Sequence, residues 1–271
     1  MRSLAPHRWP SFSRETIMYH YSTTLVKTAV IIAVLGNAVP VTGSEQPFTL
    51  HVELGATWQE KNDVQIPNSA QGTEFSLADV AGDGPWAAVR IEGTWDINEK
   101  HGLRFLLAPL SYSENGRLDE VTRFAGETFS PDEDVEADYT FNSWRLGYRY
   151  HWFAREQWDF WVGGTLKVRD AEIKLSQGGV TSSDDDLGLV PLLYLGGEYR
   201  FNDHWSLSAD LDGLAGGPGR AIDLGIRLNY AVNDQWVVGL GYRTLEGGAD
   251  TDDVYSFAWF NSLVFSADYR F

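Results

Sequence analysis

The sequence predicts an all-β protein, a closed antiparallel transmembrane β-barrel with ten strands. Three observations predict it. Apolar and polar residues alternate almost continuously after residue 45, the connections between the alternating segments are by turns short and long, and Trp and Tyr gather at the segment ends. No helical period persists in this part of the chain. Strand numbers of eight and twelve stay open as alternatives.

The individual strands are recognised by their period of two residues. In the first strand, Phe48, Leu50 and Val52 alternate with Thr49 and His51. Successive side chains of a strand point to opposite faces, so each segment has one apolar and one polar face. The expected strands cover residues 48–58, 87–97, 103–107, 144–152, 158–168, 189–201, 205–211, 222–232, 236–242 and 255–271.

The connections between these strands fall into two classes. Tight polar turns are expected at residues 98–100, 154–157, 202–204 and 233–235, and longer segments at 59–85, 112–137, 176–187, 216–220 and 246–254. Short turns at one end and long loops at the other are typical of outer-membrane barrels, with the turns in the periplasm and the loops outside the cell.

A soluble β-sandwich also alternates, but it buries its apolar face. Two features favour lipid contact instead. The polar face carries charges of both signs on nearly every strand, and aromatic residues sit beside the turns, where amphipathic rings meet the membrane interface. The expected lumen charge network consists of Arg90, Glu92, Arg104, Arg145, Arg149, Lys167, Glu198, Arg200, Asp210, Asp223, Arg227 and Arg243. The expected aromatic girdle consists of Trp95, Trp152, Trp158, Trp205, Trp236, Tyr269 and Phe271.

The N-terminus has the layout of a secretory signal peptide. A basic region up to Lys27 precedes a short apolar run at 28–35 and small residues before Ser44. The run is shorter than the roughly 20 apolar residues of a transmembrane helix. We therefore expect a cleaved segment, 1–44, and a barrel, 45–271, with translation starting at Met1 or Met18. Cleavage would change the formal charge from −17 to −20, because it removes four basic residues and one acidic residue.

Composition excludes several classes of protein. With no Cys there is no disulfide scaffold, zinc finger or thiol nucleophile. A formal charge of −17 argues against a nucleic-acid partner, because phosphate binding needs clustered Lys and Arg.

The last strand carries a resemblance. Val264–Phe271 alternates and closes on a C-terminal Phe, and it resembles the assembly signal of bacterial outer-membrane proteins. Segments 72–77, 190–193 and 242–250 resemble a family of small outer-membrane barrels without a characterised function. The resemblance implies a place in the bacterial outer membrane, contact with its lipid and lipopolysaccharide, and insertion by the barrel-assembly machinery through the strand that ends in Phe271. It implies no activity.

The histidines argue against catalysis. Several outer-membrane barrels are hydrolases, and ten strands is the strand number of the omptin proteases. Such mechanisms need a His at or above the outer leaflet as general base. After cleavage the histidines are His51, His101, His151 and His204, and all four are expected at the periplasmic end. We therefore expect no enzyme activity, no catalytic residue and no cofactor.

Acidic residues gather in the expected extracellular loops. Carboxylate oxygens suit Ca²⁺, but the spacing matches no compact calcium loop, and charges that solvate the loops are the plainer interpretation. The candidate cation-binding residues are Asp132, Glu133, Asp134, Asp184, Asp185 and Asp186.

These observations predict a narrow passive pore or a structural surface barrel. The lumen of an eight-stranded barrel is just filled by side chains, so a ten-stranded lumen has little free space, and an ion-paired plug is expected to occupy it. A narrow pore for ions or small solutes is the alternative. A second alternative is a binding or adhesion protein that uses 59–85 and 112–137 to hold a cation, lipopolysaccharide or a host ligand. An outer-membrane hydrolase is the least favoured alternative.

Overall fold

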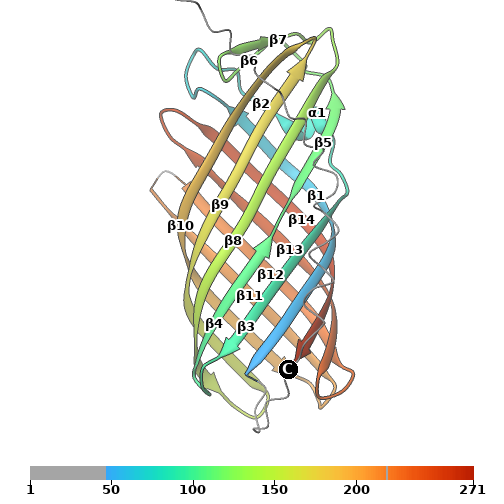
Figure 1. Ribbon diagram of the computed structural model, residues 1–271, viewed down its shortest axis with the longest axis vertical. Coiled ribbons are helices and arrows are strands. Elements are labelled where there is room, and N and C mark those ends of the chain that lie inside the picture. The colour runs from blue at the N-terminus through green and yellow to red at the C-terminus, as the bar shows by residue number, and fades with distance from the viewer. Residues whose placement is uncertain (1–46, 218) are drawn as a thin grey trace, which may run out of the picture. The chain divides into compact units, whose positions relative to one another are not determined.

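The computed structural model describes residues 47–217 and 219–271, and these form a closed antiparallel barrel (Figure 1). Each strand pairs with its neighbours along the chain, and β14 pairs with β1 to close the wall. The short strands β4 and β5 both pair with β8 and act as one interrupted strand, so the barrel has the ten strands that the sequence predicts. The signal peptide predicted for 1–44 lies outside the described residues. The barrel strands are β1 (Phe48–Gln65), β3 (Trp86–Asp96), β4 (His101–Ala108), β5 (Ser111–Gly116), β8 (Val135–Ala154), β9 (Trp158–Gln177), β10 (Val180–Arg200), β11 (Trp205–Gly216), β12 (Gly219–Ala231), β13 (Trp236–Asp250) and β14 (Tyr255–Arg270).

The apolar face of the wall points outward. On β13, Leu240 is 67% exposed whereas Arg243, three residues on and facing the lumen, is 5% exposed. A water-soluble sandwich would show the opposite arrangement. The exposed belt includes Leu54, Phe105, Leu146, Leu166, Leu193, Leu195, Leu228, Leu263 and Phe265.

Three of the four tight turns share one local motif. The side-chain oxygens of Asn98, Asn202 and Asn233 each accept two backbone N–H bonds, from the residues two and three positions later. Asn at the start of a turn is favoured because its side chain mimics a backbone turn in this way. These turns lie where the sequence predicts them, and they bring the C-terminal strand end and the periplasmic ends of the other strands to one level.

The strands are longer than expected at the opposite end. β8, β9 and β10 have 20, 20 and 21 residues, whereas β11 and β12 have 12 and 13. About 9–11 tilted residues suffice to span a bilayer. The predicted loop boundaries are therefore wrong in part. Residues 59–65, 112–116, 135–137, 176–177, 180–187 and 246–250 continue the barrel wall above the membrane.

The rest of the two longest expected loops folds into a small cap. It contains β2 (Phe75–Ser76), α1 (Leu77–Ala81), β6 (Thr122–Phe124) and β7 (Glu127–Phe129). Leu77, Phe124 and Phe129 are completely buried in an apolar cluster that also includes Val135 and Leu175 of the wall. The cap is therefore a packed unit fixed to one side of the barrel mouth. No helix among the described residues is long and apolar enough to cross a bilayer.

Candidate functional site: the lumen plug and two cavities

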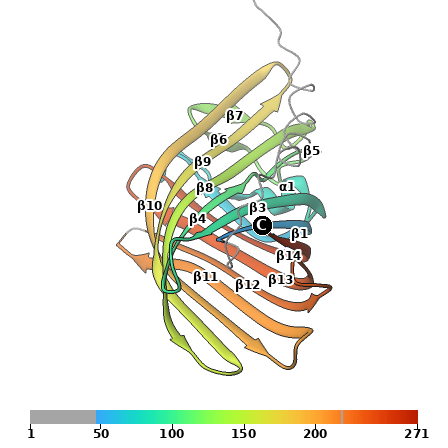
Figure 2. The ribbon, with the colours of Figure 1, turned by 60° about the horizontal axis from the view of Figure 1, so that its bottom comes forward.

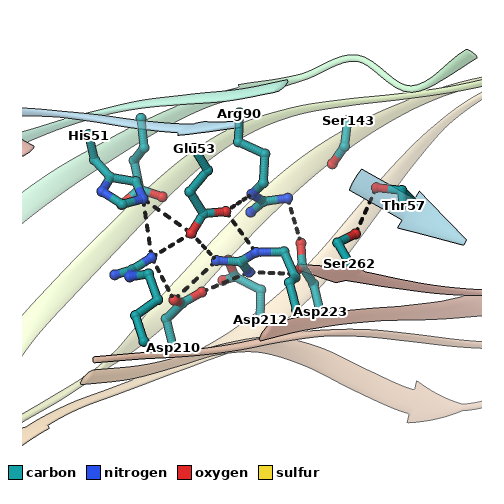
Figure 3. Close-up of polar contacts among 12 residues, drawn as sticks. His51, Glu53, Thr57, Arg90, Ser143, Asp210, Asp212, Asp223 and Ser262 are labelled. Carbon is teal, nitrogen blue, oxygen red and sulfur yellow. Dashed lines mark hydrogen bonds and ion pairs between the residues drawn. The ribbon is translucent and has the colours of Figure 1, made fainter. Parts of the chain in front are cut away.

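A charge network fills the middle of the lumen (Figure 3). Its side chains come from β1, β3, β4, β8, β11, β12 and β13 and meet across the barrel. The alternation of the strands places one or two inward side chains of each at the same level. We call the following set the lumen plug: Glu53, Glu92, Asp210, Asp212, Asp223, Arg90, Arg104, Arg145, Arg227 and Arg243.

Arg243 is the centre of this network. Its Nε lies 2.9 Å from Oε2 of Glu53, and its Nη1 lies 3.0 Å from Oδ2 of Asp210 and 2.6 Å from Oδ1 of Asp223. One guanidinium thus joins three carboxylates from three strands. The planar fork of Arg suits such multiple charge-assisted bonds better than the ammonium of Lys.

The other side of the plug is built around Asp212. Its carboxylate lies 3.0 Å from Nη1 of Arg145 and 3.4 Å from Nη2 of Arg104, and it accepts a 2.6 Å hydrogen bond from Thr165. The other terminal nitrogen of Arg145, Nη2, lies 2.5 Å from Oδ2 of Asp223. All five carboxylates of the plug are therefore paired with guanidinium groups, as buried charges require.

Two glycines leave room for the long side chains of the plug. A Cβ at Gly225 would lie 2.5 Å from Nη2 of Arg243, and one at Gly241 would lie 2.6 Å from Cγ of Arg227. The inward-facing glycines of β12 and β13 thus accommodate arginine side chains. They do not clear a path through the lumen.

Replacement of Gly225 by Val should displace the Arg243 guanidinium and lower the free energy of unfolding by about 1–3 kcal/mol, the usual cost of overpacking. Urea unfolding in vesicles, followed by Trp fluorescence, measures this. Gly164→Val is the control, because the nearest atom to a Cβ there is 3.8 Å away. Equal stability of the two variants would contradict the close packing of the plug.

Eight of the twelve side chains predicted for the lumen network belong to the plug. Arg149 instead pairs with Asp96 at 2.7 Å, and Arg200 contacts Asp159, both nearer the periplasm. Lys167 and Glu198 face the lumen but form no ion pair with any described residue. Two plug members, Glu53 and Asp212, were predicted to lie on the polar face of their strands but not to belong to the network. Both stand on the inward face of their strands, which was visible in the sequence, but only the fold shows that they meet the arginines.

The four histidines of the described chain lie in the periplasmic half, as predicted. His51 contacts Asp268 and lies 3.2 Å from Glu53. Nδ1 of His101 lies 2.6 Å from the Tyr148 hydroxyl, and Nε2 of His151 lies 2.8 Å from Asp159. His204 is in a periplasmic turn, beside Trp205. These side chains take part in structural contacts at the turn end of the barrel.

The plug separates two cavities. The periplasmic cavity, about 410 Å³, is lined by plug residues such as Arg90 and Asp210 and by turn residues such as Asn202. The extracellular cavity, about 610 Å³, is lined by Lys167, Phe141 and residues of the upper wall. No described residue lines both cavities.

The aromatic residues predicted for the girdle stand at the turn end of the outer face. Trp236 packs against Tyr269 with ring centroids 4.7 Å apart, and Tyr269 packs against Phe271 at 4.8 Å. The rings form a row at one level, which suits the periplasmic interface of a bilayer. The five tryptophans Trp95, Trp152, Trp158, Trp205 and Trp236 are all exposed.

The acidic residues proposed for cation binding do not converge. Among residues 47–217 and 219–271, no three carboxylate or His side chains are placed to hold one metal ion. Asp134 pairs with Arg117, and Asp186 with Arg169. Asp132 and Glu133 lie in the cap. Asp184, Asp185 and Asp186 lie on β10, so their assignment to a loop was wrong.

The position of the three β10 aspartates has a different physical reason. Residues 180–192 of β10 pair with β9 on one edge and have no strand on the other edge. The pairing of β10 with β11 stops at Leu193, which lies opposite Gly213. An unpaired strand edge invites pairing with another chain, and charges or Pro prevent it. The Asp run and Pro191 occupy this free edge. Burial and the neighbouring Asp185 and Asp186 raise the pKa of Asp184, as crowding of like charges at an edge would do.

Comparisons with known proteins agree with this architecture. No protein-family model matches the chain, and no curated protein matches it. Among solved structures, it is similar to the outer membrane protease OmpT from Escherichia coli, with a TM-score of 0.51 and 13% identity over 85% of this chain and 99% of that one. Ail of Yersinia pestis also matches, with a TM-score of 0.37 and 11% identity over 81% and 98% of the two chains. Neisserial surface protein A matches with a TM-score of 0.31 and 11% identity over 84% and 100%.

At 13% identity, the similarity to OmpT shows the fold alone. Together with the closed ten-stranded wall, it confirms the predicted resemblance: the chain has the fold of the bacterial outer-membrane β-barrels, and its exposed apolar belt is the surface that such barrels present to lipid.

Proposed function

We propose that the protein is a structural surface barrel whose lumen is sealed, and that it is not a passive pore. The observation that carries this proposal is the lumen plug, in which five guanidinium groups and five carboxylates bridge the barrel and leave the two cavities without a shared residue. An ion crossing this layer would have to break paired buried charges, which costs several kcal/mol.

The same proposal gives the protein no enzymatic role. The general bases that a hydrolytic barrel would need at the outer surface are missing from the described residues there, since their four histidines lie in the periplasmic half. The segments 59–85 and 112–137, which the binding alternative would use as free loops, fold partly into the wall and partly into the cap. Their Leu77, Phe124 and Phe129 side chains are buried.

Planar-bilayer recording tests the seal. The purified protein is used if its gel migration changes on boiling and if it floats with vesicles. It should then give no resolved conductance steps. The same preparation should show no swelling of vesicles in isosmotic solutions of small sugars. Regular single-channel steps that persist after repurification would overturn the proposal and support the narrow pore.

A further inference from the structure

The extracellular cavity opens sideways through the barrel wall. Above Leu193, β10 continues for more than ten residues, whereas β11 and β12 end at their hairpin, Gly216–Gly219. Figures 1 and 2 show β9 and β10 rising above this hairpin on one side of the barrel. Leu189 and Val190 of β10 and Leu214 of β11 line the cavity at the gap. We call this gap the lateral notch.

The notch lies at the level of the outer membrane surface. β11 has 12 residues from its periplasmic turn, and about 9–11 are needed to cross the bilayer. The outer face beside the notch is strongly apolar, since Leu187 and Leu189 are 74% and 68% exposed. The apolar belt thus continues to the rim of the notch, where the outer leaflet would meet the cavity.

Lys167 stands at the inner end of the cavity with its charge uncompensated. It is 2% exposed, it lines the cavity, and it forms no ion pair with any described residue. Its Nζ lies 4.4 Å from the centre of the Phe141 ring. Its cross-strand neighbours are Arg145 and Val190. Arg145 repels it and is already paired with two aspartates of the plug.

Lys167 is therefore a cation of the cavity lining that has no ion-pair partner among the described residues. Two carboxylates without an ion pair, Glu172 and Asp184, also line the cavity, but they stand five and six residues further up the wall. The plug matches five guanidinium groups with five carboxylates, and Lys167 is a sixth cation. The two other cations that line the cavity are paired, Arg169 with Asp186 and Arg220 with Glu246. A buried ammonium without a counter-charge is costly, so a single negative charge brought to Lys167 would be stabilised.

We propose that the extracellular cavity binds a single-chain amphiphile with a carboxylate head, a fatty-acid anion, that enters through the lateral notch. The carboxylate pairs with Nζ of Lys167. The chain lies along the apolar inward side chains Phe141, Ile173 and Leu214, and its end reaches the notch. A volume of about 610 Å³ is within the range of small-molecule cavities, about 300–1,000 Å³. At the inner end of the cavity the unpaired ammonium of Lys167 favours an anionic head group over a neutral or cationic one.

Displacement of a fluorescent fatty acid tests this. The full barrel is inserted in vesicles, cis-parinarate is added as the probe, and energy transfer from the protein's Trp residues reports the bound fraction. Empty vesicles give the background. Dodecanoate should displace the probe saturably, whereas dodecanol and dodecyltrimethylammonium should not. Absence of saturable energy transfer, or equal displacement by all three amphiphiles, would overturn the proposal.

Lys167→Met tests the head group. It removes the charge and keeps an unbranched apolar chain, so affinity for dodecanoate should fall at least about tenfold, the value of one charged hydrogen-bonded contact. Lys174→Met is the matched control on the same strand, because Lys174 pairs with Asp138 and does not line the cavity. The affinity of this control variant for dodecanoate should equal that of the wild type. Unchanged affinity in Lys167→Met would overturn the assignment.

Val190→Trp is the second variant. It is used if Lys167→Met does not fold into a barrel whose gel migration changes on boiling. Val190 faces the lumen directly opposite Lys167, so an indole there would fill the cavity while the ammonium stays. Probe binding should be abolished. Binding at the wild-type level in this variant would place the ligand elsewhere and overturn the proposal. Both variants leave the plug intact, so the conductance result and the binding result are independent of each other.

Discussion

Replacement of Arg243 by Met should lower the free energy of unfolding by about 3–5 kcal/mol, the cost of removing one partner from a buried ion pair. The side chain of Arg243 joins Glu53, Asp210 and Asp223, and its loss leaves three buried carboxylates short of one positive charge. The weaker packing of Met does not compensate, because its thioether donates no hydrogen bond. Reversible urea unfolding of the barrel in vesicles measures the change.

Arg220→Met is the matched control for this experiment. Arg220 is on β12 at the barrel mouth and pairs with Glu246 alone, with both side chains partly open to water. An exposed pair contributes about 1 kcal/mol or less. If Arg243→Met unfolds at the same urea concentration as the control, the network does not stabilise the barrel.

The Arg243 variant also bears on the seal. The surplus negative charge in its lumen should attract cations, and the missing guanidinium removes the link between β13 and the two strands β1 and β11. Cation-selective conductance steps should therefore appear in Arg243→Met, whereas the wild-type barrel should show none. A variant that is destabilised and still silent would locate the seal in another part of the plug.

The sequence predicted the wall because the wall obeys a local rule. A period of two is set by the strand backbone and by contact with lipid, so β9, β11 and β13 start at Trp158, Trp205 and Trp236, where their alternation begins. The inward position of Arg90, Arg145 and Arg243 follows from the same rule. The rule does not say which carboxylate each arginine meets, because the register across β1, β8 and β12 is a property of the closed barrel. Glu53 therefore looked like any polar residue of a first strand.

The upper part of the molecule escaped prediction for a different reason. Above the membrane both faces of the wall meet water or the cap, so alternation no longer distinguishes lipid from lumen. Residues 135–137 and 180–187 then resemble acidic loops, although they are strands. The unpaired charge of Lys167 is likewise invisible in the sequence, where it is one of many alternating charges. It becomes distinct only when the pairing of the other cations is known.

Replacement of Phe129 by Ala should open the cap while the barrel stays intact. Phe129 on β7 and Phe124 on β6 are fully buried in the apolar cluster that joins the cap to the upper wall. Removal of a buried Phe side chain costs about 3–5 kcal/mol, because contacts are lost and a cavity remains. The cap has a few short elements and no share in the lipid-facing belt, so the loss should appear as local opening before global unfolding.

Limited proteolysis of the vesicle-inserted protein measures this opening. Cleavage between residues 117 and 134 should become at least about a hundredfold faster in Phe129→Ala, since each 1.4 kcal/mol changes an opening equilibrium tenfold. Val121→Ala is the matched control in the same segment, because Val121 is 59% exposed and its truncation should leave the rate unchanged. The migration shift on boiling should be the same in both variants. If Phe129→Ala is cleaved no faster than Val121→Ala, the buried rings do not hold the cap closed, and the segment behaves as the free loop that its acidic sequence suggests.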